Sequence, residues 1–364
     1  MYTNASRAEP NSGRKSTFLR RAPLAVLATA FSLALFGLMI EGMARTVFDN
    51  GMDFDLEMWK YARDLKRVSA EPAIGHEHIP NASGVFMGVP VSINSIGLRN
   101  REVGPVADGT TRVVMLGDSL TFGWGVKEED TPSRLLETVL NGGTTGARNY
   151  EVINTGVGNY NAQMEVAYFM TNGFELKPDV VVLNYFINDA ESTPRRREVG
   201  WGEYSQAYVI LASAIDKVSR IFLGRADWKG YYRGLYEDGQ PGWAEGKEAI
   251  RLLASFCRER DIKLVVVNYP ELHELKNYPF PEVTGAVETL AQDEDVPFLD
   301  LRPSVEDLVP ETLWVSSSDA HPNRIANERF AEAIAGMLER SYPTLFAETG
   351  SVANVQPWGD RDRP

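Results

Sequence analysis

From about residue 110 onward, short apolar runs alternate with amphipathic stretches. The apolar runs have the length of buried strands and cover Arg112–Leu116, Glu151–Asn154, Asp179–Phe186, Leu264–Tyr269 and Pro297–Leu301. The amphipathic stretches predict helices at about 131–141, 161–173, 243–260, 282–292 and 324–340. Strands that alternate with helices predict βαβ units, and therefore a five-stranded parallel sheet covered by helices on both faces, over residues 110–345.

The connection between the third and fourth strands, residues 190–242, is too long for a simple crossover and is interpreted as a cap-like insertion. Within it, one face of a predicted helix carries Ala207, Ile210, Leu211, Ala214, Ile215, Val218 and Phe222. A cap over the functional edge of the sheet is favoured. The alternative is that Lys217, Arg220, Arg225 and Lys229 hold the insertion on anionic lipid.

The N-terminal region contains an apolar run without charge, Ala22 to Ile40, which is long enough to cross a bilayer as a helix. Basic residues precede the run and Glu41 follows it, so the positive-inside rule predicts a cytoplasmic tail over residues 1–21 and a signal-anchor helix over 22–41. The rest of the chain is then extracytoplasmic. A cleaved signal peptide, cut near Gly42-Met43-Ala44, is the alternative, and the length of the run favours the anchor.

Residues 42–109 are expected to form a connector with a helix around Asp55–Ser69 and an edge hairpin around Val85–Ile93. Pro90 makes a central strand unfavourable there. The Gly-, Pro- and Asp-rich segment 346–364 is expected to be disordered.

Composition narrows the chemistry of the 364-residue chain. Hydrophobic residues make up 43%, enough for a large core, and the net charge of −13 argues against nucleic acid as a partner. The single cysteine excludes an intramolecular disulfide and a Cys-rich zinc site. No cofactor or metal is predicted. A histidine that acts as a base must be one of the four in the chain: His76, His78, His273 or His321.

Polar residues follow the predicted strands where a parallel sheet presents its carboxyl ends. The first strand leads into Gly117-Asp118-Ser119-Leu120, and the second into the glycine-rich turn Asn154-Thr155-Gly156. The third leads into Ile187-Asn188-Asp189, and Ser318-Asp319-Ala320-His321 follows the fifth in a loop. One edge therefore collects a hydroxyl nucleophile, oxyanion donors, a base and a carboxylate, which are the components of serine hydrolysis.

This set resembles the SGNH hydrolases, also called the GDSL esterase/lipase family, over residues 110–342. Ser119, Gly156, Asn188 and His321 match the Ser, Gly, Asn and His of its four blocks, in the same order. The resemblance implies a flavodoxin-like three-layer α/β/α fold and serine esterase activity.

The chain departs from the family pattern at two positions. Phe186 stands where the third block usually has glycine, which is expected to change local packing and to leave the Asn188 amide available. The last block usually reads Asp-x-x-His, but Ser318 stands at that aspartate position and Asp319 follows it. Either Asp319 orients His321, which is favoured, or the enzyme works as a Ser-His dyad.

Residue roles follow from the resemblance together with the chemistry. Ser119 is predicted to attack an ester carbonyl, His321 to act as base and then as acid, and Asp319 to orient the imidazole. The backbone N–H groups of Ser119 and Gly156, with the Asn188 amide, are expected to hold the oxyanion. The expected substrate is an O-acyl ester of a lipid or a cell-envelope glycan. An O-acyltransferase acting on an envelope polysaccharide and a catalytically silent glycan-binding scaffold are the alternatives.

Four further residues are assigned less distinct roles. Asp118 is expected to cap the helix that follows it, and His273 to be a surface residue that could touch substrate. The pair His76 and His78 hints at a metal, but two histidines without a third ligand are a weak signal. Arg99 is expected either to form a structural salt bridge or to line the pocket.

Overall fold

The structure is a computed structural model that describes residues 13–142, 149–193, 200, 204–222 and 227–346. The chain forms two compact units. Unit 1 comprises Met1–Asn50 and Gly200–Ile215, and unit 2 comprises Gly51–Val199 and Asp216–Pro364. Residues 51–109, within the expected connector, belong to unit 2. The predicted disordered segment lies, apart from Phe346, outside the described residues.

Unit 2 is built on a five-stranded parallel sheet, which confirms the predicted fold class. Its strands are β5 (Thr110–Leu116), β6 (Asn149–Asn154), β7 (Val180–Tyr185), β8 (Lys263–Asn268) and β9 (Phe298–Asp300). They are ordered β6-β5-β7-β8-β9, with every neighbouring pair parallel. The order reverses between β5 and β7, and ligands of such sheets bind at this switch point, beyond the carboxyl ends of the strands.

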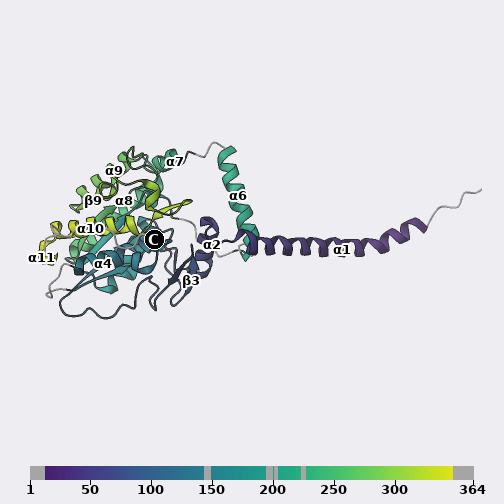
Figure 1. The fold of residues 1–364 in the computed structure, drawn as a ribbon, viewed down its shortest axis with the longest axis horizontal. Helices are drawn as coiled ribbons and strands as arrows, with labels where there is room; N and C mark the ends of the chain where they lie inside the picture. The colour runs from purple at the N-terminus through teal and green to yellow at the C-terminus, as the bar shows by residue number, and fades with distance from the viewer. Residues whose placement is uncertain (1–12, 143–148, 194–199, 201–203, 223–226, 347–364) are drawn as a thin grey trace, which may run out of the picture. The chain divides into compact units, whose positions relative to one another are not determined.

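Helices cover both faces of the sheet (Figure 1). One apolar cluster joins one face to α5 (Ala162–Thr171), α8 (Pro241–Glu259) and α9 (Pro281–Asp293). A second cluster joins the opposite face to α4 (Pro132–Gly142) and α10 (Arg324–Ser341). All five helices lie where the sequence pattern places them, with ends shifted by about two residues at most. Every residue from Thr111 to Leu116 of β5 is buried, as the continuous apolar run of a strand covered on both faces requires.

The residues before the sheet pack onto the same unit. Helix α2 (Phe54–Leu65) is shorter than expected, because Lys66–Val68 form strand β1, antiparallel to β2 (His76–His78). The predicted hairpin is present as β3 (Ser83–Phe86) and β4 (Val89–Ser92). It forms its own two-stranded sheet and does not extend the edge of the parallel sheet. Aromatic and aliphatic side chains of α2 and the hairpin pack with Phe122 and Trp124, just after the β5 strand.

Unit 1 contains α1 (Gly13–Met43), a π-helical turn over Ala44–Phe48, and the start of α6 (Gln206–Phe222). The segment Pro23–Phe48 contains a stretch of 18 residues with a mean hydropathy of 2.2 and no buried residue, so by length and composition it could cross a membrane or serve as a signal sequence. Within this unit, α6 extends sideways from the end of α1 (Figure 1). The Glu41 carboxylate accepts hydrogen bonds from the backbone N–H groups of Gln206 and Ala207, both at 3.1 Å.

Candidate active site

The residue expected to be the nucleophile, Ser119, is the first residue of the short helix α3 (Ser119–Phe122), immediately beyond β5. Asp118 caps this helix as expected, accepting a hydrogen bond from the backbone N–H of Leu120 at 2.8 Å. The preceding Gly117 has φ near +157°, and a Cβ there would lie 2.0 Å from Thr121 Oγ1. A glycine is therefore required for the chain to turn from the strand into α3.

Ser119 and His321, which are 202 positions apart, meet at this edge of the sheet. His321 Nε2 lies 2.9 Å from Ser119 Oγ, and His321 Nδ1 lies 2.6 Å from Asp319 Oδ1. The expected loop is a strand instead: β11 (Asp319–Pro322) pairs with β10 (Trp314–Ser316). Alternate residues of a strand point to the same side, so a spacing of two brings the carboxylate of Asp319 to the imidazole. Ser318 lies outside this chain of contacts, and its hydroxyl lies 3.3 Å from that of Ser316.

The Asp319 carboxylate is buried, with 5% of the residue exposed, and it is held in its charged form. Burial alone would raise its pKa, but hydrogen bonds from the His321 ring, the His321 backbone and Trp124 outweigh that effect, and the pKa is lowered. Trp124 Nε1 donates to Oδ2 at 2.9 Å and His321 N to Oδ1 at 3.0 Å. Both carboxylate oxygens are therefore fixed by donors, which sets the orientation of the carboxylate beneath the imidazole.

Gly156 lies against the backbone of α3. A Cβ at this position would lie 2.3 Å from the Phe122 nitrogen, so only glycine permits this approach. Asn154 joins the two segments: its Nδ2 donates to Thr121 O at 2.8 Å, and its Oδ1 accepts from Gly156 N at 2.9 Å. The N–H that was expected to bind an oxyanion thus donates to Asn154.

Asn188 lies in a 3₁₀ turn, Ile187–Ala190, beyond β7, on the other side of the switch point. Its Nδ2 donates to Asp118 Oδ2 at 3.1 Å, which brings Asn188 next to the residue that precedes Ser119. An amide nitrogen carries two hydrogens, so this bond leaves one more to donate. Phe186, at the unusual position, is half-buried, and its N–H donates to Asp189 Oδ2 at 2.7 Å.

Two buried acids support this turn from behind. Burial, followed by repulsion from Asp189, raises the pKa of Glu165 on α5 well above its ordinary value. Burial, followed by repulsion from Asp118, also raises the pKa of Asp189. The two side chains interact closely enough to shift each other's pKa, and the Asp189 carboxylate accepts a hydrogen bond from Phe186 N. Asp189 therefore holds the turn that carries Asn188, and the two acids are expected to titrate as a pair.

A pocket of about 380 Å³ opens beside His321. Four aromatic side chains line it, and they come from three parts of unit 2: Phe54 at the start of α2, Phe186 after β7, and Trp228 and Tyr232 of α7 (Trp228–Leu235). The α7 part of the 190–242 insertion thus lines the pocket. His273 also lines it, and its Nδ1 hydrogen-bonds to Glu271, which raises the pKa of the imidazole.

Three other residues from the sequence analysis have structural partners. Arg99 does not line this pocket, and it forms no salt bridge with another described residue: its buried guanidinium donates to the carbonyl oxygens of Phe122, Gly123 and Val126. His76 Nε2 lies 3.1 Å from Gly158 O. His78 Nε2 lies 2.7 Å from the Tyr61 hydroxyl. Within the described residues there is no cluster of three or more His, Cys, Asp or Glu side chains suited to a metal.

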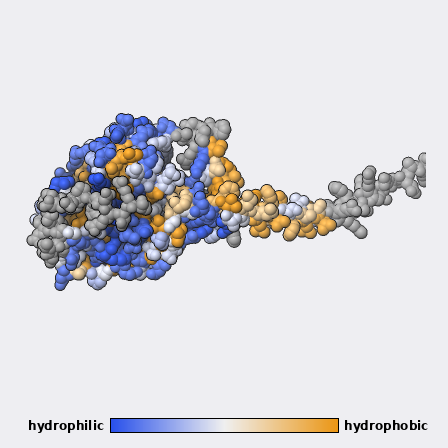
Figure 2. All heavy atoms as spheres, viewed as in Figure 1, coloured by the Kyte–Doolittle hydropathy of each residue, from blue (hydrophilic) through white to orange (hydrophobic). Residues whose placement is uncertain are grey.

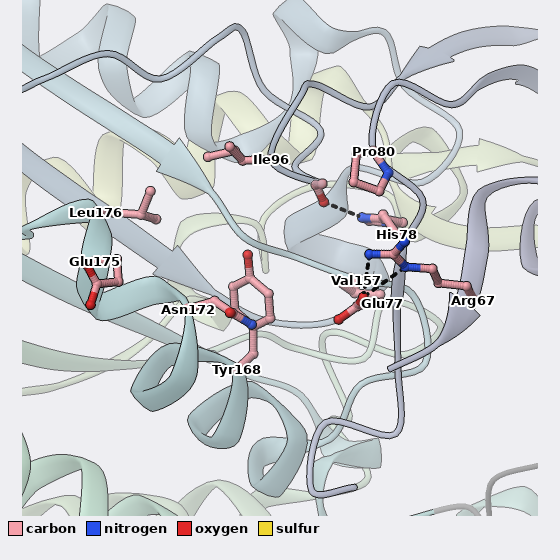
Figure 3. Close-up of a pocket in the computed structure, with 11 residues that line it drawn as sticks. Arg67, Glu77, His78, Pro80, Ile96, Val157, Tyr168, Asn172, Glu175 and Leu176 are labelled. Carbon is pink, nitrogen blue, oxygen red and sulfur yellow. Dashed lines mark hydrogen bonds and ion pairs between the residues drawn. The ribbon is translucent and has the colours of Figure 1, made fainter. Parts of the chain in front are cut away.

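A larger cavity, of about 440 Å³, lies elsewhere in unit 2 (Figure 3). The ion pair between Arg67 and Glu77, 2.8 Å apart, lies at its wall, and the Tyr168 hydroxyl points into it. None of the predicted site residues lines it. His78 does, but its ring nitrogens contact the Tyr61 hydroxyl and Gly97 O. The smaller, aromatic pocket is therefore the candidate active site.

Sequence reasoning missed three residues that hold this site: Trp124, Asn154 and Glu165. Trp124 lies five positions after Ser119, and Asn154 belongs to the glycine-rich turn but was given no role. Each acts through a contact with a segment distant in sequence, so neither spacing nor periodicity indicated it. A glutamate inside the apolar α5 segment was the one available signal for Glu165, since unpaired acids are rarely buried.

Comparison with known proteins adds a family match. Residues 115–329 match the model of the GDSL-like Lipase/Acylhydrolase family. A search of curated proteins finds no match to the chain.

Solved structures that resemble the chain have low identity and TM-scores. A putative lipolytic protein of the G-D-S-L family from Desulfitobacterium hafniense is 16% identical, with a TM-score of 0.39, and the match covers 63% of this chain and 99% of that one. A catalytic mutant of an acetylxylan esterase from Geobacillus stearothermophilus is 13% identical, with a TM-score of 0.43 over 63% of this chain and 94% of that one.

Proposed function

The chain belongs to the family of GDSL-like lipases and acylhydrolases and is an ester hydrolase, and we propose that Ser119, His321 and Asp319 are its catalytic triad. The observation that carries this proposal is the continuous chain of contacts from Ser119 Oγ through both ring nitrogens of His321 to Asp319, at 2.9 and 2.6 Å. These three side chains lie at the switch point of the sheet and beside the aromatic pocket.

The proposed reaction proceeds through an acyl-enzyme. Ser119 Oγ attacks the ester carbonyl carbon while His321 Nε2 takes its proton, and Asp319 stabilises the imidazolium that forms. The C–O bond to the alcohol then breaks, and the alcohol leaves with the proton from His321. Water attacks the acyl group with His321 as base, which releases the acid and restores the Ser119 hydroxyl.

The negative charge of the tetrahedral intermediate is assigned to donors around α3. The Ser119 N–H and the second hydrogen of the Asn188 amide bind it, and Asp118 holds the amide in place through its 3.1 Å hydrogen bond. The Gly156 N–H joins them once its hydrogen bond to Asn154 Oδ1 shifts toward the oxyanion.

The substrate is proposed to be an O-acyl ester of a lipid or of a cell-envelope glycan. The aromatic wall of the pocket supports either choice, because aromatic faces pack equally against acyl chains and against the apolar faces of sugars. The protein is proposed to be anchored by the α1 helix, with the catalytic unit on the extracytoplasmic side. Hydrogen bonds from Gln206 and Ala207 to Glu41 support an uncleaved anchor, since cleavage at Gly42-Met43-Ala44 would remove their acceptor.

A fluorophosphonate probe, which phosphonylates activated serines, tests the proposed nucleophile. Wild-type protein in detergent is expected to be labelled and to hydrolyse p-nitrophenyl acetate, and Ser119→Ala is expected to lose both properties while its thermal unfolding stays unchanged. Ser318→Ala is the matched control and should be labelled like the wild type. Folded wild-type protein that resists the probe, or labelling that persists in Ser119→Ala, would contradict the assignment.

A further inference from the structure

Helix α6 exposes a continuous apolar stripe. Tyr204, just before the helix, and four residues within it are each half or more exposed: Tyr204 58%, Tyr208 50%, Leu211 60%, Ile215 59% and Val218 50%. Their spacing of four and three residues places all five on one face of a helix. In a water-exposed helix such a stripe needs a partner, since apolar surface is normally buried against another element.

The start of α6 is tied to the end of the candidate membrane span. Besides the two backbone bonds at 3.1 Å, Glu41 accepts from Ser205 Oγ at 2.7 Å. Arg45 donates both to Glu41 and to the Tyr204 carbonyl, and Gln206 Nε2 donates to Asp49 Oδ2. Residues that are about 160 positions apart in sequence therefore form one joint within unit 1.

The depth of this joint follows from helix geometry. A hydrocarbon core of about 30 Å takes about 20 helical residues. Counted from Pro23, the first residue of the span, this places Glu41 at the boundary between acyl chains and headgroups. The N-terminus of α6 lies at the same level, because it is bonded to Glu41. Tyrosines near the joint, Tyr204 and Tyr208, are typical of that interfacial layer.

We propose that α6 lies in the membrane interface, with its Leu211 face in contact with the acyl-chain boundary of the bilayer that α1 spans. Figure 2 shows hydrophobic residues both along α1 and on α6. Lys217, on another face of the helix, is paired with Asp55 at 2.6 Å, so its charge is balanced within the chain, and the attraction that we propose is apolar contact. This assignment separates the two helices of the 190–242 insertion: α7 lines the pocket, and α6 meets lipid. It rests on the proposed anchoring by α1.

Site-specific fluorescence on the full chain in lipid nanodiscs tests the proposal. In a Cys257→Ala background, an environment-sensitive NBD label is attached to a Leu211→Cys variant and, as the control on another exposed face of α6, to an Asp216→Cys variant. The label at position 211 is expected to emit at shorter wavelength and to be quenched by nitroxide acyl chains at least about threefold more than the label at 216. Iodide dissolved in the water should quench the label at position 216 more than the label at position 211.

Two outcomes would overturn the proposal while leaving the anchor intact. One is equal access of iodide to both labels. The other is efficient disulfide formation between copies of the Leu211→Cys variant, which would show that a second chain covers the stripe. Vesicle flotation of the same samples distinguishes a failure of the anchor, since protein that does not float would overturn both ideas. Hydrolysis of p-nitrophenyl acetate by the labelled samples reports separately on the catalytic proposal.

Discussion

At the scale of single residues, the position of one carboxylate decides how the imidazole is held. The family pattern has its aspartate at position 318, but here Asp319 contacts the imidazole. Asp319 and His321 are alternate residues of β11, so their side chains point to the same side of the strand. Burial alone would raise the pKa of Asp319, but the hydrogen bonds from the His321 ring, the His321 backbone and Trp124 lower it.

Replacement of Asp319 by asparagine should preserve the shape of the site and remove its charge. We expect Asp319→Asn to lower kcat on the order of 10³–10⁴-fold, because an amide neither stabilises the imidazolium nor selects the productive tautomer. Steady-state hydrolysis of p-nitrophenyl acetate measures this. Ser318→Ala should keep wild-type rates, and a dyad mechanism is indicated if Asp319→Asn does so as well.

Asn188 offers a second residue-scale prediction. Asn188→Ala removes one oxyanion donor and should lower kcat by about 10²–10³-fold with little change in KM, because the lost bond strengthens only in the transition state. The substitution leaves Asp118 with its hydrogen bond from Leu120 N, so the fold is expected to persist. If thermal stability falls together with kcat, the result would instead assign Asn188 a structural role.

At the scale of elements, the site depends on how closely the glycine-rich turn approaches α3. Gly156→Ala places a methyl group 2.3 Å from the Phe122 nitrogen, which only a backbone shift can relieve. We expect the free energy of unfolding to fall by about 1–3 kcal/mol and kcat to fall with it. Gly104→Ala is the matched control, since a Cβ there meets nothing within 4 Å. Denaturant unfolding of both variants checks the difference.

The contact between α5 and the Asn188 turn makes stability depend on pH. The pKa of Glu165 is raised above its ordinary value of 4.5, mainly by burial, so the folded state holds a proton that the unfolded chain releases. The contribution of Glu165 to the stability of the fold is therefore complete below pH 4.5, and it is lost as the pH rises through the raised pKa of the folded state. Glu165→Gln, which keeps the size of the side chain but cannot titrate, should give a flatter loss of stability on the alkaline side.

Unfolding midpoints measured across pH test this element. The exposed substitution Glu332→Gln serves as the control and should reproduce the wild-type curve. If the unfolding midpoint of Glu165→Gln falls with rising pH as steeply as that of the wild type, Glu165 is not the group that releases the proton.

At the scale of the whole molecule, the proposed anchor predicts where the mature chain is found. The full-length protein should remain in the membrane fraction after alkaline carbonate extraction, and its intact mass should include residues 1–41. The reason is that α1 is long enough to span a bilayer and its end is bonded to α6. A soluble product that begins near Ala44 would show that the segment is a cleaved signal peptide.

The sequence by itself determined the layers of the protein and the order of its chemistry. Continuous apolar runs predicted the strands of a sheet covered on both faces, and spacing of three and four predicted the five covering helices, because burial imposes these periods locally. The convergence of the four polar blocks could be predicted for another reason, since the carboxyl ends of parallel strands must lie at one edge of the sheet.

Only the tertiary structure decided how these blocks are held. That Asp319 meets the imidazole, that Trp124 fixes Asp319 and that Glu165 supports the Asn188 turn are contacts between segments far apart in the chain. The bond from Glu41 to the start of α6 is of the same kind. Hydrophobic periodicity records which face of an element is buried but not which element covers it, so such pairings appear only when the chain is folded.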